Sequence, residues 1–150
     1  MKEGKGLMRT VLIAHHDTAF ASRLSAAVLD AGYRTIICPG PWPPATRCIR
    51  CDVGYCPLTE GADLLVYDPE LVGKDDRGFL HTLAVDTARA HPEVPVLLAW
   101  VGEDQPASVE AIRAEVSRIG IAARDPRALA YQVEALIGPP VDPSIVQVEV

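Results

Sequence analysis

The sequence lacks any apolar stretch long enough to cross a lipid bilayer. A spanning helix needs about 20 predominantly apolar residues, and the longest apolar runs here are interrupted well before that length. Residues 1–8 are polar and contain two lysines and two glycines, without the apolar segment typical of a secretion signal. We therefore expect a cytoplasmic protein that makes no use of a membrane.

Basic residues are also scarce, since 14 lysines and arginines stand against 20 aspartates and glutamates, for a net charge of −6. Binding to a nucleic-acid backbone without sequence preference requires a basic surface, so we expect no nucleic-acid partner. The sequence contains no G-x-S-x-G element, no P-loop and no dinucleotide-binding fingerprint. These absences favour a protein that is not an enzyme of those classes.

The residues that are present suit one domain, spanning 1–150. A chain of 150 residues that is 49% hydrophobic can bury a single core. Short apolar runs typical of buried strands alternate with segments whose apolar residues recur at helical spacing. The predicted strands are Thr10–Ala14, Thr35–Cys38, Asp63–Asp68, Val94–Val101 and Gly120–Ala123.

The four predicted helices fall between and after these strands. The first begins at Asp17 or Thr18 and ends near Gly32; the second runs from Phe79 to about His91, after a polar loop over Gly73–Gly78. The third covers Val109–Ile119, and the last follows Asp125-Pro126 and ends before Gly138. This alternation predicts an α/β fold, a doubly wound five-stranded parallel sheet with helices on both faces.

Two segments depart from the alternation. Residues 39–61 are rich in proline and cysteine, which excludes a regular helix through most of the segment and predicts an irregular loop in place of the helix after the second strand. The tail 139–150 contains the strand-like stretch Ser144–Val150, which could pair along a sheet edge or with a second copy.

Polar residues follow two of the predicted strands directly. His15, His16 and Asp17 come after the first strand, and Asp68 ends the third. In open α/β sheets the functional site lies beyond the carboxyl ends of the strands, so we expect the site to gather around these residues.

Several of these stretches resemble the receiver domain of bacterial response regulators. Val11–Asp17, with Ala31-Gly32-Tyr33 after it, is similar to the family's first strand, acidic cluster and turn before the second strand. Ala62–Asp68 resembles the third strand, whose last residue accepts the phosphoryl group. Pro95–Trp100 resembles the fourth strand, and Ala123–Pro126 the lysine-proline turn after the fifth.

The resemblance extends from about Thr10 to Gly138 and implies a flavodoxin-like sheet with strand order 2-1-3-4-5. It places the family's acidic pair on His15 and His16, with Asp17 one position late. Phosphoryl transfer to a carboxylate requires a divalent cation held by oxygen ligands, and imidazole is a poor ligand for magnesium.

The other family positions also differ. The resemblance places the hydroxyl residue on Trp100, or on Ala99 with a shift of one residue, and the lysine on Asp125, which reverses the charge. Asp68 alone is retained. These differences predict a pseudo-receiver in which Asp68 is not phosphorylated in the usual way.

The four cysteines offer a separate hypothesis. Cys48 and Cys51 have the C-x2-C spacing that lets two thiolates bind one metal ion; Cys56 follows in the same loop, and Cys38 ends the second strand. A zinc site of these four residues, or one that includes His15, is the first alternative. An iron–sulfur cluster, a disulfide between loop cysteines and ordinary buried thiols remain open.

The leading functional hypothesis is therefore a non-catalytic signalling or interaction domain that binds a protein partner, or itself as a homodimer. A metal- or redox-responsive sensor built on the cysteine loop is the second. The third is a small hydrolase-like enzyme that uses Asp68 with His15 or His16 as acid and base.

Overall fold

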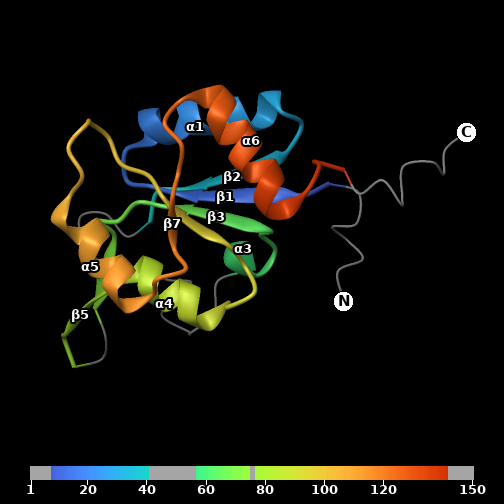
Figure 1. Ribbon diagram of the computed structural model, residues 1–150. Helices are drawn as coiled ribbons and strands as arrows, with labels where there is room; N and C mark the ends of the chain where they lie inside the picture. The colour runs from blue at the N-terminus through green and yellow to red at the C-terminus, as the bar shows by residue number, and fades with distance from the viewer. Residues whose placement is uncertain (1–7, 41–56, 75–76, 142–150) are drawn as a thin grey trace, which may run out of the picture.

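The computed structural model describes residues 8–40, 57–74 and 77–141. Its centre is a parallel sheet of five strands in the order β2-β1-β3-β6-β7 (Figure 1). The strands are β1 (Thr10–Ala14), β2 (Arg34–Cys38), β3 (Leu64–Tyr67), β6 (Val96–Leu98) and β7 (Gly120–Ile121). Numbered within this sheet alone, the order is 2-1-3-4-5, so the predicted topology is confirmed.

Helices cover both faces of the sheet. Helices α1 (Thr18–Asp30) and α6 (Pro126–Ile137) lie together on one face, and α4 (Leu83–Ala90) and α5 (Ala107–Glu115) lie on the other (Figure 1). The short helix α3 (Pro57–Glu60) precedes β3 and falls inside the predicted irregular segment 39–61. Within the described residues, none of the helices has both the length and the apolar character that crossing a membrane would require.

Both faces of the central strands are buried, which explains their uninterrupted apolar sequences. Along β1, Val11 and Ile13 pack under α1 and α6, whereas Leu12 and Ala14 belong to the core under α4 and α5. The same alternation continues in β3, and each face therefore has its own hydrophobic core.

The starts of α1 and α6 follow the sequence signals closely. The side chain of Asp17 accepts a hydrogen bond from the backbone N–H of Phe20 and caps α1. Asp125 accepts bonds from the N–H groups of Arg127 and Ala128 at the start of α6. Gly32, with a φ of +100°, provides the left-handed turn after α1.

The segment between β3 and α4 differs from the prediction. In place of the start of the predicted loop 73–78 and the first residues of the predicted second helix, the strands β4 (Val72–Lys74) and β5 (Leu80–Thr82) pair antiparallel. Gly78, with a φ of +88°, lies just before β5. Phe79 and Leu80 are 66% and 62% exposed, so they do not belong to the buried helical face that their spacing indicated.

Other elements are also shorter than predicted, among them the fifth strand, which is limited to Gly120–Ile121. The third predicted helix ends at Glu115 instead of Ile119, because Val116 already has an extended backbone, with a φ of −133° and a ψ of 93°. The fourth strand is limited to Val96–Leu98, although Val94 and Ala99 beside it are also buried. Most of segment 39–61 and the stretch Ser144–Val150 lie outside the described residues.

Helix α6 provides a matched test of which face is buried. Leu129 is 1% exposed, whereas Leu136 on the same helix is 44% exposed. We expect Leu129→Ala to lower the free energy of unfolding by about 2–5 kcal/mol, since it leaves a cavity in the core. Leu136→Ala should change it by less than about 0.5 kcal/mol in the same urea titration. Equal effects of the two substitutions would contradict this packing.

Candidate functional site

The site forms where three neighbouring strands end at the same edge of the sheet. His15 and His16 follow β1, Asp68 follows β3, and Ala99 and Trp100 follow β6. Two backbone hydrogen bonds continue the register past the strand ends: Asp68 N–H donates to the Ala14 carbonyl at 2.8 Å, and Ala99 N–H donates to the Tyr67 carbonyl at 3.1 Å. The parallel register thus places these five residues together.

The carboxylate of Asp68 is buried, and both of its oxygens accept hydrogen bonds. Oδ1 accepts from the backbone N–H of Glu70 at 2.8 Å. Oδ2 accepts from the backbone N–H of His16 at 3.2 Å and lies against Nδ1 of the same histidine. The residue is 1% exposed. These partners compensate for the loss of water around a buried carboxylate.

His15 is buried and joins β1 to β6. Its Nε2 donates to the Ala99 carbonyl at 3.2 Å, and its Nδ1 accepts from the Asp17 N–H at 3.0 Å. An acceptor role for Nδ1 places the proton on Nε2. Burial lowers the pKa of His15 below its usual value, against the nearby Asp68 carboxylate, which raises it. His15 is therefore a neutral structural group at physiological pH.

His16 lies between this buried layer and solvent. Its side chain is 25% exposed, and its ring stacks on that of His15 with 5.3 Å between the ring centres. Phe20 of α1 lies on His15 at 4.9 Å. His16 is the part of the cluster that solvent reaches.

The two other acidic residues of the predicted site, Asp17 and Asp125, cap helices. Asp17 caps α1, and its hydrogen bond from Phe20 N–H holds the pKa of its carboxyl below the usual range. Asp125 caps α6. The structure thus brings His15, His16 and Asp68 together, while Asp17 and Asp125 direct their oxygens to backbone N–H groups.

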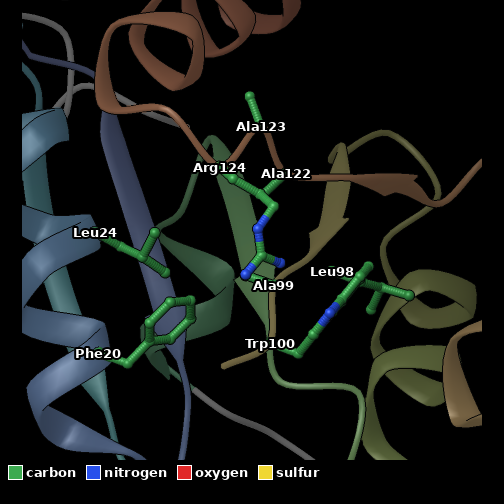
Figure 2. Close-up of a pocket in the computed structure, with 8 residues that line it drawn as sticks. All are labelled: Phe20, Leu24, Leu98, Ala99, Trp100, Ala122, Ala123 and Arg124. Atoms are coloured by element: carbon green, nitrogen blue, oxygen red, sulfur yellow. The ribbon is translucent and has the colours of Figure 1, made fainter. Parts of the chain in front are cut away.

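Trp100 lines a neighbouring cavity of about 90 Å³, between α1 and the segment after β7 (Figure 2). Arg124 extends from that segment toward Trp100, and its guanidinium carbon is 5.9 Å from the indole ring centre. Arg124 also donates to the Gly102 carbonyl. The sequence prediction missed Arg124, although a cation directly before Asp125 was the available signal.

Of the four cysteines in the predicted metal site, the structure describes one. Cys38 ends β2, and its carbonyl accepts the His15 N–H at 3.0 Å. Cys48, Cys51 and Cys56 lie outside the described residues, so the four-cysteine site stays a prediction. Among the described residues, the ligand atoms of His15, His16 and Asp68 lie within 4.8 Å of one another, a group that does not include Cys38.

Comparison with solved structures agrees with this architecture. A pilus assembly-related protein from Burkholderia pseudomallei is 22% identical, with a TM-score of 0.57, over 87% of this chain and 90% of the other. A pilus assembly protein (CpaE) from Burkholderia thailandensis is 25% identical, with a TM-score of 0.55, over 86% and 98%.

Receiver domains give a similar superposition at lower identity. The CheY-like receiver domain of Methanospirillum hungatei is 16% identical, with a TM-score of 0.55, over 85% of this chain and 92% of the other. The chemotaxis protein CheY4 of Vibrio cholerae is 13% identical, with a TM-score of 0.57, over 86% and 98%. No family model and no curated protein sequence matches the chain. The chain therefore has a receiver-like, flavodoxin-like fold, as its residues indicated.

The lowered pKa of His15 predicts how stability depends on pH. Below the usual value of 6.5 the unfolded chain binds a proton that the native His15 does not. The native state therefore loses stability as the pH falls below about 6.5, down to the lower native pKa. Urea titrations between pH 7.5 and 5 should show this loss in the wild type and a shallower one in His15→Gln. Equal slopes in the two proteins would contradict the assignment.

Proposed function

We propose that this chain is a pseudo-receiver: a receiver-like signalling or interaction domain that acts through protein contacts and not through phosphorylation. The observation that carries the proposal is the environment of Asp68. Its carboxylate is 1% exposed and holds hydrogen bonds from His16 and Glu70 on both oxygens. The surroundings of this carboxylate are those of a structural group, which accepts hydrogen bonds from the backbone that follows β1 and β3.

The groups that would assist phosphoryl transfer are replaced as well. A divalent cation would need oxygen ligands beside Asp68, and the two side chains beside it are imidazoles. Ala99 has no hydroxyl to offer a phosphoryl oxygen. Asp125, at the expected lysine position, is a helix cap, and Arg124 lies over Trp100. Each of these differences raises the barrier to forming an acyl phosphate.

The described roles of the proteins with similar structures support the same proposal. The two pilus assembly proteins are 22% and 25% identical, whereas the two receiver domains are 16% and 13% identical. We infer that the chain serves as a receiver-like domain in a protein of an assembly machine of that kind, with another protein or a second copy as its partner. For the acid–base alternative, both nitrogens of His15 are already bonded, which leaves the pair of His16 and Asp68.

Incubation with acetyl phosphate and magnesium tests the proposal directly. We expect no covalent phosphoryl group on the native wild-type chain by intact-protein mass spectrometry, because Asp68 is buried and imidazoles stand beside it in place of the oxygen ligands that a divalent cation needs. Asp68→Asn is the matched control. A phosphoryl adduct that forms on the wild type and is absent from Asp68→Asn would overturn the proposal.

A second candidate function is metal sensing, and one observation favours it. The ligand atoms of His15, His16 and Asp68 lie within 4.8 Å of one another. Both nitrogens of His15 hold hydrogen bonds within the fold, so a metal would be bound by His16 and Asp68 in place of the contact between these two side chains. Imidazole nitrogen, carboxylate oxygen and thiolates from the cysteine loop together suit zinc. In such a sensor, binding of the metal or oxidation of the cysteines would determine the conformation of the cysteine loop.

Elemental analysis of the protein purified without added metal tests this second candidate. If it is correct, we expect about one zinc ion per chain, with strong loss in Cys48→Ser/Cys51→Ser and partial loss in His16→Ala. His91→Ala, at a histidine outside the cluster, is the control and should retain the metal. A metal-free wild type whose 4 cysteines all titrate as free thiols would exclude it.

A further inference from the structure

One edge of the main sheet is open in the described part of the chain. Strand β2 pairs with β1 on one side, and none of the described strands pairs with its other side. Arg34 N–H donates to Arg9, and the Cys38 carbonyl accepts from His15, so residues 34 and 38 face β1. Because these directions alternate in a parallel ladder, the backbone groups of Thr35 and Ile37 point toward the open side. The Ile37 side chain is also 37% exposed.

The chain leaves its last described helix beside the start of this strand. After α6, the Gly138 carbonyl accepts from the Tyr33 hydroxyl at 2.6 Å, and the Pro140 carbonyl accepts from Arg9 N–H at 2.9 Å. A Cβ on Gly32 would lie 3.1 Å from Pro140. Residues 138–140 are thus fixed next to the turn that leads into β2.

The sequence beyond Val141 suits a strand at this edge. Asp142 precedes a proline, which favours an extended backbone. The stretch Ser144–Val150 then has valine at 146, 148 and 150 and no further proline, a composition common in strands. Residues 141–143 can span about 10 Å when extended, which exceeds the spacing of about 4.8 Å between neighbouring strands.

The handedness of the connection is also favourable. Helices α1 and α6 lie on the same face of the sheet (Figure 1). The connection from β1 through α1 to β2 moves toward the β2 edge over that face. A connection from β7 through α6 to a strand outside β2 moves in the same direction over the same face. It therefore has the same right-handed sense as β1–α1–β2, which nearly all such crossovers adopt.

We propose that residues 144–150 of the same chain form a sixth strand, parallel to β2, on the open edge of the sheet. The new strand supplies partners for the backbone groups of Thr35 and Ile37 and covers the Ile37 side chain. It also protects an edge that would otherwise be available for pairing between molecules. The short connection from α6 favours the segment of the same chain over a second copy, because its effective concentration at the edge is high.

Amide hydrogen exchange of the full-length protein, followed by NMR, tests this strand. The variant Val146→Pro/Gln147→Pro removes one backbone donor on each side of the segment, so it disrupts pairing whichever residue faces β2. We expect exchange at Thr35 and Ile37 to become faster by about tenfold or more in this variant. Val146→Ala/Gln147→Ala keeps both donors and should retain most of the protection. Ile36, whose N–H faces β1, should be unchanged in both variants.

Three outcomes would overturn the proposal. In the first, Thr35 and Ile37 exchange rapidly in the wild type, which means that nothing covers the edge. In the second, they remain equally protected in the proline variant, which means that a different segment covers it. In the third, the protection of the wild type disappears on dilution, which means that the strand comes from a second copy. Protection that is independent of concentration and lost only in the proline variant supports it.

Discussion

The carboxyl edge of the sheet depends on the hydrogen bonds that the buried carboxylate of Asp68 accepts. This carboxylate accepts hydrogen bonds from His16, which follows β1, and from Glu70, two residues beyond itself. A hydrogen bond to a charged group contributes about 1.5–3 kcal/mol, and leaving such a group buried without partners costs at least as much. These hydrogen bonds compensate for the burial of the carboxylate and join the residues that follow β1 and β3 at this edge.

His15, which is buried beside Asp68, adds a second set of hydrogen bonds to this edge. It connects the Asp17 backbone, at the start of α1, to the carbonyl of Ala99 at the end of β6. Its burial and lowered pKa keep it neutral, so no second charge enters the buried layer. Together, His15 and Asp68 give the edge a fixed polar network of the kind that makes a fold specific.

The site could be predicted only in part, because two kinds of information are needed. The positions of His15, His16 and Asp68 at strand ends follow from local sequence and the general geometry of parallel sheets. The burial of Asp68 and the hydrogen bonds of His15 depend on neighbours 52 and 84 residues away along the chain. Arg124 was missed for the same reason, since its contact with Trp100 joins two separate loops.

The hairpin of β4 and β5 shows where local pattern failed. Phe79 and Leu80 have the spacing of a buried helical face, but they are exposed. The backbone groups of β5 pair instead with Val72–Lys74, and α4 begins only at Leu83. Spacing alone does not reveal whether a partner strand will compete for the same backbone groups. That competition is a property of the folded chain.

The sequence pattern by itself determined the class of fold and the starts of α1 and α6, whereas the order of the strands in the main sheet followed from the resemblance to receiver domains. It could do so because strands buried on both faces require continuous apolar runs, and helix starts require nearby capping side chains. Only the tertiary structure decided which polar residues are structural and which face solvent. That distinction depends on distant backbone groups that meet only when the strands align, and no local pattern encodes them.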